Sequence, residues 1–338
     1  MESVYPKAKV AAVQFEPRML DLEASVAHAC DLIREAGAAG AKVIAFPEAA
    51  IPGYPWWIWM SDPGSGMKHY VHLFQNSVEI PSPSVRSLSQ AARDAAAYVC
   101  ISVTEKDKGS LYLTQLWFDP AGDLVGKHRK LKATNAEMTI WGDGDTSLMP
   151  VLETEYGRLG GLQCWEHYIP LNVATMGAMG EQIHVSSWPI GLPDPTHPFA
   201  VQQCINAALY YAVSNGTFTL CASQIWTEAQ ADVVCDTPEQ CAMMGLGHGF
   251  TRIIGPNGCV VSELPSDEEG ICYADVDLAD AIPVKYFIDT AGHYSTPGTM
   301  QLYVDMSEHT SVHLEGARPQ RRLSYDEIQY QEVQAEKD

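Results

Sequence analysis

The sequence predicts an α/β fold that contains two sheets, and three observations support this prediction. Apolar runs of strand length alternate with amphipathic helical stretches along most of the 338 residues. The opening segment, residues 10–46, has the order strand, helix, strand, which is typical of a parallel pair of strands. Two similar hairpin patterns, at residues 111–128 and 250–264, indicate a pseudo-twofold arrangement of two sheets.

The first half of the chain alternates regularly between short apolar strands and helices whose apolar residues recur on one face. A turn at Asp119–Gly122, which contains proline and glycine, joins the two strands of the first hairpin. The expected strands are 10–15, 42–46, 98–103, 111–118 and 124–128, and the expected helices are 21–39 and 82–97.

The second half repeats this alternation. A glycine turn leads into its first strand, and a Gly/Met-rich loop is expected between residues 223 and 250. The expected strands are 158–163, 182–186, 218–223, 250–254, 259–264 and 271–276, and the expected helices are 171–179 and 199–213. No linker or change of composition precedes the polar tail Arg318–Asp338, so one large domain is favoured. The tail is expected to be mobile or to make contacts between subunits.

Cys164 is a candidate nucleophile because it lies where a predicted strand meets a predicted helix. Such an elbow exposes a side chain at the sheet edge, among backbone N–H groups near a helix start. Those donors and the helix dipole are expected to favour a thiolate, the form of cysteine that attacks electrophiles. A buried cysteine that packs as a small hydrophobic residue is the alternative.

Glu48 is a candidate general base. It follows the strand at 42–46 at its carboxyl end, where α/β proteins gather their functional sites. A carboxylate in a loop is usually solvated. Glu48, however, lies close in the sequence to prolines and to the tryptophan-rich segment 56–59. Desolvation by these residues is expected to raise the pKa of Glu48 towards that of a useful base.

A basic run at residues 127–132 stands out in this acidic chain. It contains four cationic side chains in six residues, where a surface turn would be the ordinary interpretation. A lysine from this run close to Cys164 would stabilise a thiolate and any oxyanion that forms beside it.

Composition excludes several classes of partner. The formal net charge of −21 argues against binding to nucleic acid or to an anionic membrane surface.

We see no signal peptide and no apolar run long enough to span a membrane. The nine cysteines are scattered and odd in number, which suits reduced thiols and predicts a cytoplasmic protein. His69 and His72, three residues apart, lack further ligands at metal-binding spacing, so we expect surface histidines and no metal site.

With Glu48, Lys130 and Cys164 in this order, the chain resembles the nitrilase superfamily of carbon-nitrogen hydrolases, and within it the true nitrilases. The segments that carry the resemblance are 46–48, 128–132 and 164–168, with further signatures at 52–59 and 292–294. The resemblance implies a four-layer α-β-β-α sandwich, with two mixed sheets each covered by helices. It also implies a hydrolase domain over residues 8–281 and a C-terminal extension over 282–338 that makes subunit contacts. A homodimer, extended in some members to a spiral or filament, is expected.

The resemblance also implies roles for single residues. Cys164 matches the nucleophile, Glu48 the general base and Lys130 the cation that supports the tetrahedral intermediate. Glu137 matches a second carboxylate that orients Lys130. The implied reaction converts a nitrile to a carboxylic acid and ammonia through a thioimidate and a thioester on Cys164, with neither metal nor organic cofactor. The candidate substrate-binding residues are Tyr54, Trp57, Trp141, Trp165 and Trp188.

Three alternatives stay open at this stage. A cyanide-degrading enzyme has the same nucleophile motif, and an amidase of the wider superfamily uses the same triad on amides. A scaffold without activity, or a thiol redox sensor, would belong to a different class. An intact triad argues against the scaffold, and the lack of an evident resolving cysteine argues against the sensor.

Overall fold

The computed structural model of the chain describes residues 5–309 and Gly316. Residues up to Ser307 belong to one compact unit, to which the following description refers. The tail Arg318–Asp338, for which mobility or subunit contacts are predicted, lies outside the described residues.

The first sheet has six strands in the order β12-β1-β2-β3-β4-β5. Its centre, β1 to β3, is parallel, and antiparallel strands flank it on both sides. This arrangement follows from the strand-helix-strand opening predicted from the sequence, since a helix crossover returns the chain in the same direction. The strands are β1 (Lys7–Gln14), β2 (Val43–Ala45), β3 (Tyr98–Asp107), β4 (Ser110–Phe118), β5 (Leu124–Arg129) and β12 (Gly270–Asp277).

The second sheet repeats the plan, in the order β11-β10-β9-β8-β7-β6. Its strands β7, β8 and β9 are parallel, and the others pair antiparallel at the two sides. The pseudo-twofold arrangement expected from the two hairpins is therefore present. The strands are β6 (Val151–Thr154), β7 (Gly157–Gln163), β8 (Ile183–Trp188), β9 (Phe218–Ser223), β10 (Arg252–Ile254) and β11 (Val260–Glu263).

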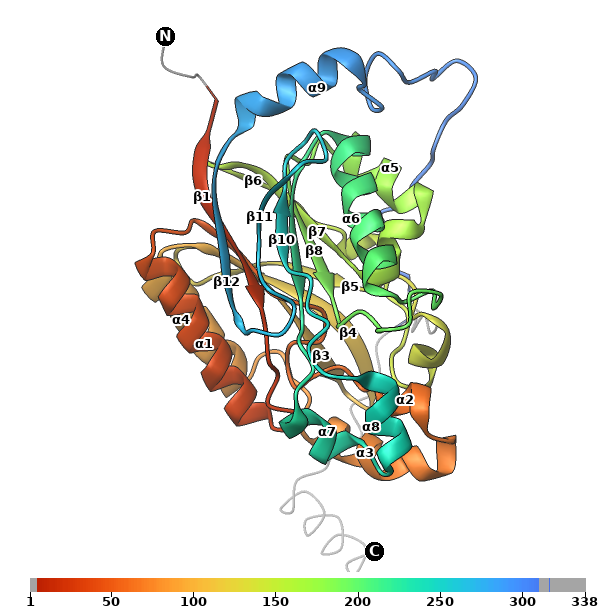
Figure 1. Ribbon diagram of the computed structural model, residues 1–338. Helices are drawn as coiled ribbons and strands as arrows, with labels where there is room; N and C mark the ends of the chain where they lie inside the picture. The colour runs from red at the N-terminus through yellow and green to blue at the C-terminus, as the bar shows by residue number, and fades with distance from the viewer. Residues whose placement is uncertain (1–4, 310–315, 317–338) are drawn as a thin grey trace, which may run out of the picture. The chain divides into compact units, whose positions relative to one another are not determined.

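Helices cover the outer faces of both sheets, which confirms the α-β-β-α sandwich. Helices α1 (Leu22–Ala38) and α4 (Pro83–Ala95) pack on the first sheet, and α5 (Pro170–Ala178) and α6 (Val201–Asn215) pack on the second (Figure 1). A separate apolar core lies between the two sheets. It contains side chains from both, such as Val10 of the first sheet and Val185 of the second. The strand ends that carry the candidate residues therefore meet between two rigid sheets.

Capping residues account for where the covering helices begin. The Asp21 side chain accepts from the Ala24 N–H at the start of α1. The Ser82 side chain caps α4, and Pro83 occupies its first turn, where a missing N–H costs nothing. Ala91, Ala92 and Ala95 face the core from α4, because small side chains allow close packing against α1.

Four further helices correct the expectations from sequence. They are α2 (Trp57–Met60), α3 (Pro63–Gln75), α7 (Glu228–Val234) and α8 (Pro238–Met244). The Gly/Met-rich loop predicted for residues 224–249 is thus partly helical. Thr237 and Gln240 form a capping box before α8, a sequence signal that would have revealed this helix. These helices surround an aromatic-rich cluster that includes Tyr54, Trp57 and Trp226.

The remaining elements are short. They are the 3₁₀ helices η1 (Asn135–Thr139), η2 (Thr146–Leu148), η3 (Cys164–Tyr168) and η4 (Leu278–Asp280), and the helix α9 (Ala281–Phe287). His69 is buried in α3 against Trp57, so it is not the surface histidine expected from sequence. In the part of the chain that the structure describes, no helix is both long and apolar enough to cross a membrane.

Candidate active site

Cys164 lies at a sharp elbow between β7 and the five-residue helix η3. Its φ is 47°, in the left-handed region that non-glycine residues rarely adopt. This conformation costs about 1–2 kcal/mol, so it persists only where the surrounding structure holds it. The side chain is 1% exposed. The predicted position at the end of a strand is confirmed, but the elbow leads into a 3₁₀ turn, and α5 begins only at Pro170.

Glu166 ties this elbow to the segment that carries Lys130. Its Oε2 accepts from the N–H of Gln163 at 2.9 Å, and its Oε1 accepts from the N–H of Leu131 at 2.9 Å. His128 lies against the same carboxylate, with Nε2 2.9 Å from Oε2. Burial would raise the pKa of Glu166, but His128 and the two N–H donors outweigh it and hold the pKa below its ordinary value. Glu166 is not among the site residues predicted from the sequence.

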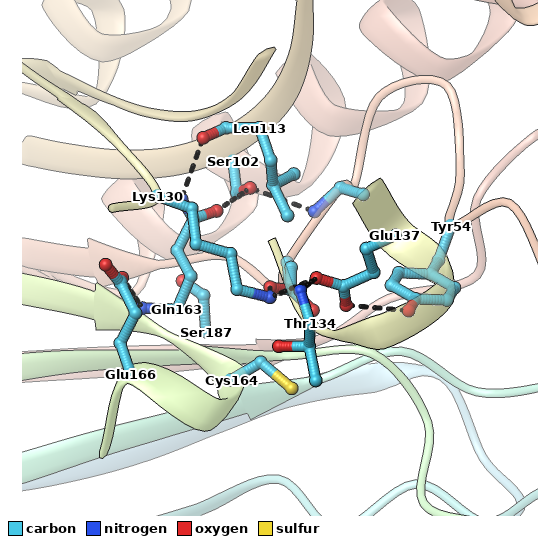
Figure 2. Close-up of polar contacts among 12 residues, drawn as sticks. Tyr54, Ser102, Leu113, Lys130, Thr134, Glu137, Gln163, Cys164, Glu166 and Ser187 are labelled. Atoms are coloured by element: carbon cyan, nitrogen blue, oxygen red, sulfur yellow. Dashed lines mark hydrogen bonds and ion pairs between the residues drawn. The ribbon is translucent and has the colours of Figure 1, made fainter. Parts of the chain in front are cut away.

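Lys130 joins the two candidate carboxylates. It follows β5, and its Nζ donates to Glu48 Oε1 and to Glu137 Oε2, both at 2.8 Å. Glu137 also accepts from the N–H of Thr134 and from the hydroxyl of Tyr54, each at 2.7 Å. Figure 2 shows Lys130, Glu137 and Tyr54 joined in one line, with the Cys164 sulfur beside them. The predicted orienting contact between Glu137 and Lys130 is present.

A buried polar network holds the ends of the two sheets together behind these side chains. Ser102 Oγ accepts from the N–H of Ala49, next to Glu48, and donates to Gln163 Oε1 at 2.5 Å (Figure 2). Gln163 precedes Cys164, so one hydroxyl links the backbone beside Glu48 to the side chain of the residue beside the thiol. The N–H of Glu48 donates to the carbonyl of Trp188 across the same gap.

Carboxylate oxygens of Glu48 and Glu137 and the sulfur of Cys164 all lie within 4.8 Å of one another. Glu48 Oε2 is buried and makes no hydrogen bond with any described residue, so it is available to a nearby proton. Three such ligand atoms resemble a metal site. Here, however, the Lys130 ammonium already bonds to both carboxylates and supplies the positive charge that they need.

Burial and charge set the protonation of this cluster. Burial raises the pKa of Glu48 to about 8, although Lys130 opposes the shift. The sequence-based expectation of a raised pKa is therefore confirmed. Burial alone would lower the pKa of Lys130. The charges of Glu137 and Glu48 outweigh it and keep the pKa well above its ordinary value, so Lys130 stays cationic.

The thiolate expected at Cys164 is not favoured before substrate binds. Burial, and then the charge of Glu48, raise the pKa of the thiol well above its ordinary value, and Lys130 only partly opposes them. A short 3₁₀ turn also offers a weaker dipole than the α-helix that the sequence suggested. Cys164 is therefore a thiol that needs a base at the moment of attack, and Glu48 is within reach.

The sequence match decides the family. The model of the family described as carbon-nitrogen hydrolase matches residues 9–286. The chain belongs to the carbon-nitrogen hydrolase family. A nitrilase of Bacillus sp. (strain OxB-1) is 60% identical over 329 residues, 97% of each chain, which places this carbon-nitrogen hydrolase in the nitrilase branch. A cyanide hydratase of Neurospora crassa is 36% identical and covers 90% of this chain and 89% of its own.

Solved structures support the fold of this carbon-nitrogen hydrolase. The crystal structure of a carbon-nitrogen hydrolase from Helicobacter pylori G27 aligns with a TM-score of 0.68 at 19% identity. The alignment covers 84% of this chain and 93% of that one. At this identity the likeness concerns the fold alone.

The five candidate substrate-binding residues of this hydrolase lie in different surroundings. Tyr54 packs against Trp141 and donates to Glu137, so both belong to the site. Trp165 directly follows Cys164. The ring of Trp188 instead stacks on His167, while its carbonyl holds the backbone of Glu48. Trp57 lines a cavity of about 260 Å³ beside α3 and η1, next to Ile140. Substrate contact by these residues stays a prediction.

Proposed function

We propose that the protein hydrolyses an organic nitrile to the carboxylic acid and ammonia, with Cys164 as nucleophile. One observation carries the proposal: the Cys164 thiol, the free oxygen of Glu48 and the Lys130–Glu137 ion pair share one buried site. A nitrile carbon is a weak electrophile, so it needs a soft nucleophile together with delivery of a proton to nitrogen. Membership of the nitrilase branch agrees with this chemistry.

In the first half of the proposed reaction the thiol adds across the carbon–nitrogen triple bond. Glu48 takes the proton from sulfur, the S–C bond forms, and Glu48 returns the proton to nitrogen to give a thioimidate. One water then adds to the C=N bond, which produces a tetrahedral carbon that carries nitrogen, oxygen and sulfur. Lys130 and the backbone N–H of Trp165 stabilise the negative charge that develops.

In the second half the C–N bond breaks and nitrogen leaves as ammonia with a proton from Glu48. The resulting thioester accepts a second water, the C–S bond breaks, and the acid and free thiol are released. The sum is one nitrile and two waters to one acid and one ammonia. The chain's own acid, base and cation supply every proton and charge in this scheme, so it uses no cofactor.

A panel of aliphatic, arylaliphatic and aromatic nitriles, with release of ammonia as the readout, tests the proposal. Each nitrile is assayed beside its matching amide, and cyanide is included. Turnover of amides without nitriles would favour the amidase alternative. Turnover of cyanide alone would favour a cyanide-degrading enzyme, the alternative to which the likeness to the cyanide hydratase of Neurospora crassa lends some support.

Replacing Glu137 by glutamine is expected to slow turnover and to raise the share of amide product. Lys130 and Tyr54 donate to different oxygens of Glu137, and a glutamine places an NH₂ donor where one of these oxygens accepts, so one of the two bonds is lost. A loosened Lys130 would stabilise the oxyanion less well and permit earlier loss of sulfur. Chromatography gives the acid-to-amide ratio. Tyr54→Phe, which leaves the carboxylate intact, should shift the ratio less, and an unchanged ratio in a slowed Glu137→Gln enzyme would contradict the role.

The pH dependence should follow Glu48. Its pKa is raised to about 8, and only the ionised form can take the thiol proton. As pH falls below this value the ionised fraction decreases, so kcat/KM should drop about tenfold per pH unit on the acid side. Initial rates between about pH 6 and pH 9 measure this limb. A flat profile over the whole range would exclude a raised pKa at the base.

We also propose that the protein is a homodimer, and that dimers can assemble further into a spiral or filament. We propose that it works in the cytoplasm. The outer face of α5 and α6 exposes several apolar side chains, namely Ile169 (36%), Leu171 (62%), Tyr210 (56%) and Val213 (38%). Such a patch is typical of a face that a second subunit covers. Light scattering on an active preparation should report a dimer or larger, and an active monomer would contradict the proposal.

The division at residues 281 and 282 stays a prediction, and with it the assembly role of the C-terminal extension. Helix α9 starts at Ala281, directly at that position. Deletion of Arg318–Asp338 is the direct test. It should change the size of the assembly and leave the reaction at Cys164 intact.

A further inference from the structure

A line of buried polar side chains reaches Cys164 from the outer side of the second sheet, and the reaction scheme above does not use it. Glu181 precedes β8, His184 lies on β8 and His167 lies in η3. Glu181 Oε1 lies 2.8 Å from His184 Nδ1, and His184 Nε2 lies 2.9 Å from His167 Nε2. His167 Nδ1 ends the line 2.6 Å from the carbonyl oxygen of Cys164. None of the three side chains is more than 3% exposed.

Packing fixes the members of this line in place. Tyr211 on α6 donates its hydroxyl to Glu181 Oε2, and its ring stacks on His184 with centroids 3.7 Å apart. The His167 ring stacks on Trp188 at 5.1 Å. Gly160 on β7, which pairs with His184, leaves room for the carboxyl group, because a Cβ there would collide with Glu181 Oε1. The neighbouring strand therefore has to carry a glycine at this point.

The donors and acceptors allow only one direction of hydrogen-bond donation along the line, from Glu181 towards the carbonyl of Cys164. The carbonyl of Cys164 can only accept, so His167 Nδ1 carries a proton and donates. In a neutral ring His167 Nε2 then accepts, and His184 Nε2 donates to it. His184 Nδ1 accepts in turn, so its partner Glu181 carries a proton. Tyr211 donates to the remaining oxygen of that carboxyl group, which completes the line without an unpaired group.

Burial agrees with this neutral form. It lowers the pKa of His167 to about 3, with a contribution from His184, and lowers the pKa of His184 well below its ordinary value. Burial also raises the pKa of Glu181 to about 8, against the opposing hydrogen bond from Tyr211. Both rings are therefore neutral and the carboxyl group is protonated at neutral pH.

The line ends on the peptide group that supplies an amide donor to the proposed site. In a trans peptide the carbonyl of Cys164 and the N–H of Trp165 point in opposite directions. An N–H in the first turn of a helix has no acceptor inside that helix. Holding the carbonyl towards His167 thus turns the N–H of Trp165 away from His167, and a chain of hydrogen bonds polarises the peptide and strengthens that donor.

We propose that Glu181, His184 and His167 are positioning residues, which hold the Cys164–Trp165 peptide so that the Trp165 N–H faces the negative charge that develops on the substrate. This inference rests on the proposed function. It also accounts for the left-handed backbone of Cys164. The elbow is held from one side by Glu166, through the N–H of Gln163, and from the other by this line, through the carbonyl of Cys164.

Two substitutions of Glu181 separate positioning from mere packing. In Glu181→Gln the side-chain amide still donates to His184 and its oxygen still accepts from Tyr211, so kcat should stay within about threefold of wild type. Glu181→Leu fills a similar volume but leaves His184 Nδ1 without a donor. We expect kcat to fall about 10- to 100-fold with KM unchanged, somewhat less than the loss that follows removal of an oxyanion donor itself. Alkylation of Cys164 by iodoacetamide should stay within about threefold in both, because Glu48 and Lys130, whose charges act on the thiol, are unchanged.

Hydrogen–deuterium exchange tests the same point without substrate. The peptide that covers residues 160–168 should exchange faster in Glu181→Leu than in wild type, and at the wild-type rate in Glu181→Gln. Leu88→Ala is the matched control, since Leu88 is fully buried against the first sheet and has no contact with the line. It should lower Tm at least as much, yet leave both kcat and exchange at 160–168 unchanged.

Equal behaviour of the Gln and Leu variants, in kcat and in exchange, would overturn the proposal. So would a loss of thiol alkylation that parallels the loss of kcat, because the line would then act on the sulfur. Failure of the wild type to hydrolyse any nitrile would contradict the proposed function alone. The exchange experiment would still decide whether the line holds the elbow.

Discussion

Replacing Cys164 by alanine is expected to reduce nitrile turnover by at least about four orders of magnitude, to below detection in most assays. Every covalent step of the proposed reaction takes place on its sulfur, and no other described thiol lies between Glu48 and Glu137. The fold should survive, because alanine fits the same backbone and removes only one atom from the core. Ammonia release measures turnover. Mass spectrometry should find an acyl adduct on wild-type Cys164 and none in the variant.

Cys100 provides the matched control. It is fully buried on β3, in the core between the two sheets, and faces none of the candidate side chains. Cys100→Ala should keep wild-type kcat and KM and lose only about 1 kcal/mol of stability. Turnover that persists in Cys164→Ala would refute the covalent mechanism, whatever the Cys100 variant does.

Replacing Glu48 by glutamine is expected to lower kcat/KM about 10²- to 10⁴-fold, the range typical of a lost general acid–base group. The amide oxygen still accepts from Lys130, so the position of the cation should change little. What disappears is the group that moves a proton from sulfur to nitrogen. Glu48→Asp keeps a carboxylate that is one methylene too short, so it should fall between wild type and Glu48→Gln.

Alkylation of Cys164 distinguishes loss of the base from loss of the thiol. The negative charge of Glu48 raises the pKa of Cys164, so its removal should leave the thiolate fraction equal or larger. Iodoacetamide should therefore modify Glu48→Gln at least as fast as wild type while nitrile turnover is lost. If alkylation and turnover were lost together, Glu48 would serve mainly to shape the site around the sulfur.

Local patterns in the sequence were enough to predict most of the fold. Apolar residues with a period of two or 3.6 predicted the main strands and the helices α1, α4, α5 and α6, because burial of one face is a local requirement. The helices α2, α3, α7 and α8 were not predicted, because they cover an aromatic cluster at the ends of the sheets. Apolar side chains there are needed at irregular positions.

The sequence by itself determined the chemical groups of the candidate site. Glu48, Lys130 and Cys164 each follow a predicted strand, and their order carries the resemblance to nitrilases. It could not determine that Lys130 bonds to both carboxylates, since the contact with Glu48 joins residues 82 positions apart. Nor could it determine the protonation of Cys164. That depends on burial between two sheets, which outweighs the favourable charge of Lys130.

Only the tertiary structure decided how the nucleophile is held. Glu181 lies in the loop before β8, His184 lies on β8 and His167 lies in η3, and together they follow no motif of spacing. They form one line because β8 runs beside β7 in parallel register, which brings His184 next to Gly160 on the strand that leads into the elbow. His167 and His184 are 17 positions apart, and the pairing of β7 with β8 brings the element that follows β7 within hydrogen-bond distance of His184.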